Sequence, residues 1–247
     1  MSETPSGCPL CGEARAEPFF HDRFRRYLHC PGCDLVYVPP EERLGPEAEK
    51  ARYDLHENHP GNLGYRRFLQ RLCEPMCERI PRGAEGLDFG CGPGGALATL
   101  FLERGRRMIG YDPFYAPEAS VWSREWDFIT ASEVLEHLHH PAGELDRLFR
   151  VLKPGGWLGI LTGWRPDPVA FATWHYITDS THVAFYSPAT FRHIAARWQV
   201  DLTLIDPHIA LMRKPPVLDP AGSQPNPCGA MPDDPLLHSK AGGKGSS

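Results

Sequence analysis

The sequence predicts an α/β fold in which helices cover both faces of a mostly parallel sheet, with a small cysteine-rich module in front. From Gly86 onward, short apolar runs alternate with helical segments, as in LDFG, ALATLFLERG, RMIGYD, DFITA and WLGILTG. This alternation is typical of strands joined by crossover helices. The last two apolar runs, VDLTLI and IALMRK, predict a C-terminal antiparallel hairpin. Before residue 40 the chain carries two C-x-x-C pairs instead.

Composition divides the chain into four segments. We assign residues 1–40 to the cysteine module, 41–85 to a helical cap or linker, 86–214 to the α/β domain and 215–247 to a disordered tail. Apolar residues recur at helical spacing in the cap, where Pro75 is expected to kink or split the helix. The tail is rich in Pro, Gly and Ser, so it buries too little apolar surface to offset the entropy of ordering.

Bulk properties favour an ordinary cytoplasmic protein. The 247 residues are 41% hydrophobic and carry a net charge of −5, which gives no general case for nucleic-acid binding. The N-terminus lacks the basic and apolar regions of a signal peptide, and no apolar run is long enough to span a membrane. Cysteines in a reducing compartment are expected to be thiols or metal ligands.

The paired cysteines predict a zinc ribbon. Cys8-x-x-Cys11 and Cys30-x-x-Cys33 are separated by 18 residues, a spacing typical of structural zinc sites. Each pair can form a tight knuckle whose thiolates occupy two corners of a tetrahedron. Four cysteine ligands leave no position for catalysis, so the metal would stabilise a segment too small to fold on its own core.

A glycine-rich loop follows the first apolar run of the α/β domain. Gly90, Gly92 and Gly95 fit G-x-G-x-x-G and open a helix, so a dinucleotide enzyme has to be considered. Asp88 favours a different ligand, because a carboxylate at the strand end would repel a pyrophosphate and attract the ammonium group of S-adenosylmethionine. Asp112, 22 residues after Gly90, can bind ribose hydroxyls in either case.

Several motifs together resemble the class I S-adenosylmethionine-dependent methyltransferases. These are LDFGCGPGG, YDP, WDFITASEVLEHL and FRVLKPGGWLGI, and the resemblance covers about residues 86–195. The cysteine module in front is similar to that of a group of bacterial methyltransferases. The resemblance implies a Rossmann-like sheet with S-adenosylmethionine as cofactor, its methionine end at the loop, its ribose at Asp112 and its adenosine bordered by Pro113 and Phe114. The implied cofactor-binding residues are Asp88, Gly90, Cys91, Gly92, Gly94, Asp112 and Pro113.

One departure from the family pattern concerns the third strand. Asp112 and Asp127 are 15 residues apart, too few for the helix and strand that this fold usually places there. We therefore expect the third strand to be short or absent. The family residue that contacts adenine cannot be transferred to this chain.

A cluster of acids and histidines predicts a metal site at the acceptor end. Glu133, Glu136 and His137 stand at i, i+3 and i+4, which would place them on one face of a helix, and His182 follows later. The pattern resembles metal sites of small-RNA 2′-O-methyltransferases and ubiquinone-pathway O-methyltransferases, which implies Mg²⁺ or Mn²⁺ beside the acceptor oxygen. His182 and His137 are the candidate catalytic residues, with His182 as general base if no metal binds.

The alternative interpretation of this cluster is structural. Thr130 and Glu133 would form a capping box, with Glu136 and His137 in an exposed turn. Two further groups also have two interpretations. Trp174, His175 and Tyr176 either line an acceptor pocket or belong to the core, and Arg23, Arg25 and Arg26 either form a solvated face or offset the charge of the ribbon's thiolates.

The sequence thus favours an enzyme that methylates a hydroxyl group on a small-molecule acceptor. Methylation of RNA is an alternative that the acidic net charge disfavours. A methyltransferase-like binding module without activity is a second alternative, which the intact glycines and Asp112 disfavour. A dehydrogenase fits Asp88 and the KPGGWL strand poorly. The sequence gives no indication of oligomeric state.

Overall fold

The structure is a computed structural model that describes residues 7–55 and 61–217. All but three residues of the tail expected at 215–247 lie outside this range. The described residues up to Pro216 belong to one compact unit. Within the described ranges, no helix combines the length and apolarity needed to cross a bilayer.

A six-stranded sheet forms the centre of the α/β domain, in the spatial order β5-β4-β6-β7-β10-β9. The three pairs among β5, β4, β6 and β7 are parallel, whereas β10 pairs antiparallel with both β7 and β9. This confirms the predicted mostly parallel sheet with a C-terminal hairpin. The strands are β4 (Glu85–Phe89), β5 (Arg107–Tyr111), β6 (Trp126–Ser132), β7 (Leu152–Leu161), β9 (Asp201–Asp206) and β10 (Ile209–Arg213).

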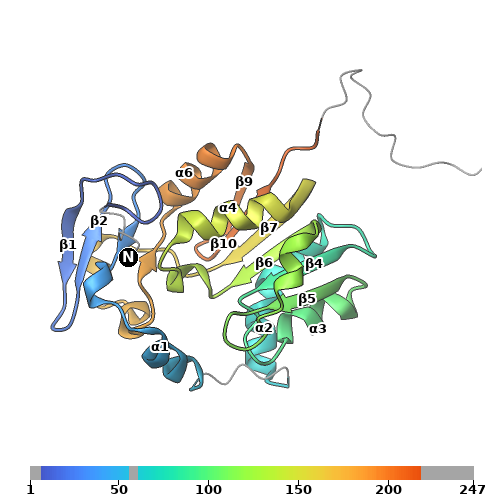
Figure 1. Cartoon of the computed structure of the whole chain (residues 1–247), viewed down its shortest axis with the longest axis horizontal. Helices are drawn as coiled ribbons and strands as arrows, with labels where there is room; N and C mark the ends of the chain where they lie inside the picture. Colours follow the sequence, from blue (N-terminus) through green and yellow to red (C-terminus); the bar gives the residue numbers. More distant parts are fainter. Residues whose placement is uncertain (1–6, 56–60, 218–247) are drawn as a thin grey trace, which may run out of the picture. The chain divides into compact units, whose positions relative to one another are not determined.

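Helices cover both faces of this sheet, as Figure 1 shows. The first face packs against α2 (Leu63–Cys77) and α3 (Ala96–Glu103), and the second against α4 (Pro141–Val151) and α6 (Pro188–Trp198). Successive strand residues serve opposite faces: Leu211 joins the α2–α3 core, while Ala210 joins the α4–α6 core. Both faces of the sheet are therefore buried, as expected for a parallel arrangement.

The third strand expected from the general pattern is absent from the described chain. Between β5 and β6 lies a single turn of 3₁₀ helix, η2 (Ala119–Ser123). Strand β5 is consequently an edge of the sheet. This confirms the prediction made from the short spacing between Asp112 and Asp127.

The cap differs from its prediction in where the helix is interrupted. Helix α1 (Pro46–Tyr53) ends well before α2 begins, and Pro75 lies inside α2 near its end. The helix is therefore not split at Pro75, whereas a kink there stays a prediction. Leu69, Leu72 and Met76 are buried on the sheet, and this packing keeps the last turn helical despite the missing proline N–H.

The cysteine module shares a sheet with a distant part of the chain. A four-stranded sheet has the order β1-β2-β3-β8, with β1 (Glu17–His21), β2 (Arg26–His29), β3 (Val36–Tyr37) and β8 (Ala184–Phe185). Strands β3 and β8 pair antiparallel, and Val38 N donates to Val183 O at 2.9 Å. The segment after His182 is thereby part of the ribbon's sheet. The remaining short elements are η1 (Pro40–Glu42), η3 (Leu135–His137), α5 (Pro168–Phe171) and η4 (His175–Thr178).

Arg25 reinforces this connection, contrary to both interpretations offered for the arginine cluster. Its side chain is buried, with 7% of the residue exposed. The guanidinium donates to Tyr27 Oη and to four backbone carbonyls, those of Ile177, Asp179, Ser180 and His182, at 3.0–3.2 Å. Arg25 therefore fixes the loop that carries His182. Arg26 instead pairs with Glu41 and Glu42 at the surface.

We expect Arg25→Leu to lower the free energy of unfolding by about 2 to 4 kcal/mol, because buried carbonyls would lose their donor. Hydrogen exchange should rise in residues 177–182, while the zinc content stays unchanged. Arg23→Leu is the matched control, since Arg23 is exposed on the same turn. Equal exchange in the 177–182 loop of both variants would show that Arg25 does not hold it.

Candidate functional site

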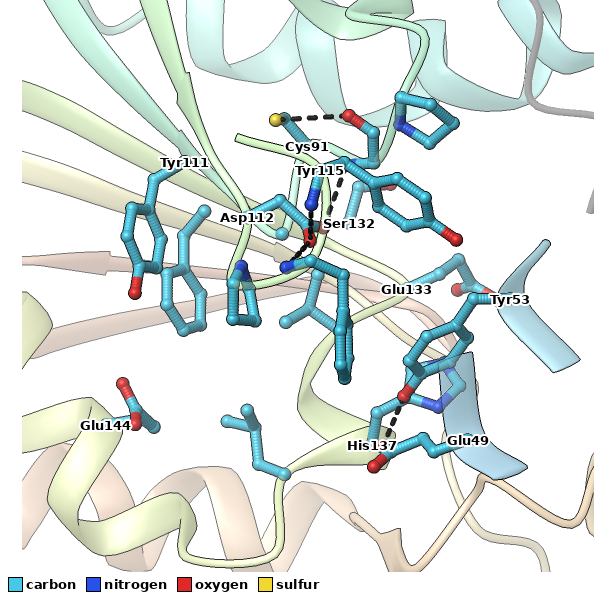
Figure 2. Close-up of a pocket in the computed structure, with 18 of the residues that line it drawn as sticks. Glu49, Tyr53, Cys91, Tyr111, Asp112, Tyr115, Ser132, Glu133, His137 and Glu144 are labelled. Atoms are coloured by element: carbon cyan, nitrogen blue, oxygen red, sulfur yellow. Dashed lines mark hydrogen bonds between the residues drawn. The ribbon is translucent and has the colours of Figure 1, made fainter. Parts of the chain in front are cut away.

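A cavity of about 540 Å³ lies at the carboxyl ends of β4, β5 and β6. This volume falls in the range of small-molecule and cofactor sites, and in parallel sheets this edge is where ligands bind. Figure 2 shows the labelled lining residues. The lining comes from the glycine loop, the β5 end, the η3 region, α1, α2 and α4.

The glycine loop needs backbone conformations that other residues avoid. Gly90 has φ +74°, and a Cβ added there would approach Val134 Cγ2 to 2.4 Å. Gly92 has φ +58°, but a Cβ there would meet nothing within 4 Å, so this position is open. Gly90, Cys91, Gly92 and Pro93 line the cavity, whereas Gly94 is not part of the lining. The loop can therefore bring backbone close to a ligand.

Asp112 joins this loop to the end of β5. Its Oδ2 accepts from Gly92 N at 3.1 Å, and its Oδ1 accepts from Phe114 N and Tyr115 N at 2.8 and 3.1 Å. A carboxylate has about four acceptor positions, so capacity remains on Oδ2 for a ligand hydroxyl. Asp112, Pro113 and Phe114 all line the cavity, as the proposed ribose and adenosine positions require.

Asp88 lies deeper than the prediction assumed. It is 4% exposed and is not part of the cavity lining, and its Oδ1 accepts from Thr130 Oγ1 at 2.8 Å. Burial raises the pKa of Asp88 to about 7. Direct contact with an ammonium group stays a prediction. Thr130 lies within β6, so the capping-box interpretation of Thr130 and Glu133 is wrong.

The acid and histidine cluster forms, but not on one face of a helix. Glu133 has φ +53° directly after β6, and the following helical turn, η3, is 3₁₀ and begins at Leu135. The helical prediction is therefore wrong. Glu136, His137 and His182 nevertheless converge, with one ligand atom from each within 4.8 Å of the others. Glu133 is outside this group but lines the cavity beside it.

The carboxyl groups of Glu133 and Glu136 both lie beside the hydroxyl of one buried tyrosine, Tyr176. Tyr176 Oη donates to Glu136 Oε1 and lies 3.4 Å from Glu133 Oε2. Thr162 Oγ1 donates to Glu136 Oε2 at 2.9 Å. Burial, together with the charge of Glu136, raises the pKa of Glu133 to about 9, so this carboxyl group retains its proton at neutral pH. Tyr176 was an acceptor-pocket candidate, but it supports the acids from behind the cavity wall.

The two histidines have defined tautomers. His182 Nδ1 lies 2.7 Å from Tyr176 O, and His137 Nδ1 lies 3.2 Å from Thr181 O. Because a carbonyl only accepts, each Nδ1 donates and each Nε2 carries the lone pair. Burial lowers the pKa of His137 to about 4, which keeps this ring neutral at neutral pH. The rings of His137 and His182 lie 4.7 Å apart between centroids.

Sequence reasoning missed the residues that the cap and α4 contribute. The Tyr53 ring lies 5.1 Å from the His137 ring and 5.8 Å from the Phe114 ring, and its hydroxyl donates to Glu49 Oε1. Residues of the cap and of α4 that also line the cavity are Tyr65, Phe68, Glu144 and Arg147. Only the helical spacing of Tyr65 and Phe68 was visible, and it indicated burial rather than a site.

The four predicted cysteine ligands come together at the N-terminus. Cys8 Sγ lies 3.5 Å from Cys33 Sγ, Cys11 Sγ lies 3.4 Å from Cys30 Sγ, and one atom from each of the four lies within 4.8 Å of the others. Burial raises the pKa of Cys30 to about 12, whereas the hydrogen bond from Cys33 lowers that of Cys8 to about 5. Four sulfur atoms at this separation are the donor set of a structural zinc site, and metal binding would require all four thiols to lose their protons.

Comparison with known proteins identifies the family. A family model described as a methyltransferase domain matches residues 62–205. The chain belongs to this family, and its sheet is that of the class I S-adenosylmethionine-dependent methyltransferases. The sequence-based prediction of family and fold is thus confirmed.

The curated relatives give only a partial indication of the reaction. The chain is 31% identical over 129 residues to the ubiquinone biosynthesis O-methyltransferase of Paracidovorax citrulli, covering 42% of this chain and 50% of the relative. It is 32% identical over 133 residues to the trans-aconitate 2-methyltransferase of Methylobacterium radiotolerans, covering 44% of this chain and 50% of the relative. The chain therefore spans about half the length of these relatives.

A solved structure supports the fold alone. The 1,6-didemethyltoxoflavin-N1-methyltransferase of Burkholderia thailandensis, solved with bound 1,6-didemethyltoxoflavin and S-adenosylhomocysteine, superposes with a TM-score of 0.51 at 17% identity. The match covers 81% of this chain and 100% of that chain.

We expect Asp112→Ala to weaken the binding of S-adenosylmethionine by about 1.5 to 3 kcal/mol, because charge-assisted hydrogen bonds to ribose are lost and the glycine loop loses its anchor. Calorimetric titration measures the change. Asp127→Ala is the control, because Asp127 pairs with Lys153 at the opposite end of β6. An Asp112→Ala dissociation constant equal to that of the parent protein would contradict this ribose site.

We expect the protein to carry about one zinc ion per chain and Cys30→Ser to lose it. Since β3 pairs with β8, loss of the ribbon should also raise hydrogen exchange in residues 182–186, while α2 and α3 stay protected. Elemental analysis and exchange mass spectrometry measure both effects. Cys73→Ser, which removes a buried thiol outside the cluster, should keep the zinc. Protein prepared without chelator and lacking zinc would rule out the ribbon.

Proposed function

We propose that this protein transfers the methyl group of S-adenosylmethionine to a hydroxyl oxygen of a small-molecule acceptor. The observation that carries this proposal is the convergence of Glu136, His137 and His182: the two histidines line the cavity that also contains the glycine loop and Asp112, and Glu136 is buried behind them. The relatives named as ubiquinone biosynthesis O-methyltransferases support oxygen as the acceptor atom. The cavity volume of about 540 Å³ supports a small acceptor.

The lining fits a bound cofactor. Ser132 Oγ and Glu144 Oε2 are both buried and have no hydrogen-bond partner among the described residues, and both residues line the cavity. Buried polar atoms without partners are uncommon and cost free energy, so a ligand that supplies partners would be stabilised. The open position at Gly92 leaves room for that ligand beside the loop.

The donor set also fits a divalent cation. Glu136, His137 and His182 offer one carboxylate and two imidazoles, and Thr162 and Tyr176 hold the Glu136 carboxylate in place. A cation here would act as a Lewis acid that lowers the pKa of the acceptor hydroxyl. Oxygen and nitrogen ligands of this kind suit Mn²⁺ and Mg²⁺. In the metal-free alternative, His182 Nε2 accepts the hydroxyl proton.

Methyl transfer then requires that the protein hold the cofactor and the acceptor in the right relative orientation. Bound S-adenosylmethionine would supply an electrophilic methyl group; its transfer would form the bond from methyl carbon to acceptor oxygen, break the bond from methyl carbon to sulfur and release S-adenosylhomocysteine, with the hydroxyl proton passing to His182 Nε2 or, where a cation binds, to solvent. Asp112 and the glycine loop orient the cofactor, while Tyr53 and Phe114 exclude water from the acceptor side with their rings.

We expect EDTA to leave the affinity for S-adenosylmethionine unchanged and to stop methyl transfer, and Mn²⁺ or Mg²⁺ to restore it. Labelled cofactor and small-molecule fractions of cell extract provide the assay. His182→Ala should raise the Mn²⁺ concentration needed for half-maximal activity, because one ligand is lost.

His139→Ala is the matched control, since His139 lines the same cavity outside the ligand group. Its metal requirement should equal that of the parent protein. Ribbon zinc is measured in every sample, because EDTA also competes for it. Full transfer in EDTA with the ribbon zinc retained would contradict the metal and leave His182 as the base.

A further inference from the structure

Helix α1 contributes an acid, Glu49, to the end of the cavity where the acid and histidine cluster lies. Glu49 lines the cavity, and 13% of its side chain is exposed. In Figure 2, Glu49 lies beside Tyr53 and His137, far from Cys91 of the glycine loop. The Tyr53 hydroxyl donates to Glu49 Oε1 at 2.6 Å, and the Tyr53 ring lies 5.1 Å from the His137 ring. Glu49 is therefore about one aromatic ring away from the cluster.

The Glu49 carboxylate has an oxygen available for a ligand. Its Oε2 accepts no hydrogen bond from the described residues and is not fully buried. His139 Nε2 lies 3.9 Å from Oε2, which is beyond hydrogen-bonding distance. Burial raises the pKa of Glu49 and the hydrogen bond from Tyr53 lowers it, with no contribution from a Lys or Arg. A mostly buried carboxylate in this state gains from a cation that a ligand supplies.

Basic side chains are scarce in the lining. Arg147 is the one Lys or Arg among the described lining residues. Its guanidinium packs over the rings of Trp122 and Tyr111, 3.6 and 5.7 Å from their centroids. Figure 2 shows Tyr111 at the far side of the cavity from Glu49. A phosphate or carboxylate on the acceptor would therefore meet an acid near Glu49 and no basic side chain to offset the repulsion.

We propose that the acceptor carries an ammonium group, which pairs with the Glu49 carboxylate while the acceptor hydroxyl reaches the acid and histidine cluster. The rings of Tyr53 and Phe114, with centroids 5.8 Å apart in the cavity lining, add attraction for a cation. The substrate class is then a hydroxylated amine whose two groups are about one ring apart. This assignment rests on the proposed methyl transfer to a hydroxyl oxygen.

A binding test compares tyramine with 4-propylphenol, in which a methyl group replaces the amine. Each is titrated calorimetrically, with Mn²⁺ present, into protein saturated with S-adenosylhomocysteine. The parent protein should bind tyramine about ten- to hundredfold more tightly. Glu49→Gln keeps an acceptor for the Tyr53 hydroxyl but removes the charge, so the two dissociation constants should become similar. Glu49→Asp should keep part of the preference.

The matched control is Glu47→Gln, because Glu47 is exposed on the same helix and lies outside the cavity lining. Its preference for tyramine should equal that of the parent protein. Thermal unfolding shows whether each variant folds, and if Glu49→Gln does not, the preference of Glu49→Asp decides. Weaker binding of S-adenosylhomocysteine by Glu49→Gln would mean that Glu49 binds the cofactor, which would overturn the assignment.

A second test assumes no particular acceptor. Small molecules from cell extract are separated by ion exchange at neutral pH, and each fraction is incubated with labelled S-adenosylmethionine and the parent protein. Methyl acceptance should be confined to the fraction retained on a cation exchanger. Acceptance outside that fraction, or equal affinity of the parent protein for the two phenols, would overturn the assignment. Absence of transfer to every fraction would instead contradict the proposed function.

Discussion

The buried guanidinium of Arg25 joins the cysteine module to the wall of the cavity, and the acceptor end depends on that junction. Five acceptors surround it, and four of them are backbone carbonyls of residues 177–182. An irregular loop at this depth exposes carbonyls that no helix or sheet satisfies, so a donor from elsewhere in the chain is required. Together with the pairing of β3 and β8, Arg25 fixes the position of His182 in the cavity wall.

This junction changes what the cysteine cluster contributes. A ribbon with its own sheet would be an independent appendage, and removing its metal would leave the site intact. Here the fourth strand of the ribbon's sheet is β8, which follows His182 directly. Asp34, next to Cys33, extends the contact by accepting from Arg165 Nη2 at 2.9 Å and from Ser187, the N-cap of α6. Metal bound at the cysteines would therefore stabilise the acceptor wall as well as the ribbon.

The sequence correctly predicted those features in which a residue type is required by the backbone or ligand geometry of its immediate neighbourhood. The cysteine spacing, the glycine loop and Asp112 at a strand end could all be located because short-range geometry dictates them. The absence of the third strand followed from the short spacing between Asp112 and Asp127 alone. The helix expected over Glu133, Glu136 and His137 does not form. Glu133 has a positive φ, and its N–H donates a hydrogen bond to Leu161 O of the neighbouring strand. The spacing of residues in a sequence does not reveal such a conformation. The role of Arg25 could not be assigned from the sequence, since the carbonyls that accept from it are 152 to 157 residues away along the chain.

The two departures from a plain methyltransferase sheet lie on opposite sides of one cavity. Loss of the third strand leaves β5 as an edge, and α4 with Glu144 and Arg147 borders the cavity beside it. On the other side, the ribbon supplies Arg25 and β3, which position the loop of His182. Between these two sides lie the glycine loop and Asp112, which we propose bind the methyl donor. Because both departures lie in elements that flank the glycine loop and Asp112, they change the walls of the cavity and not the residues proposed to bind the methyl donor.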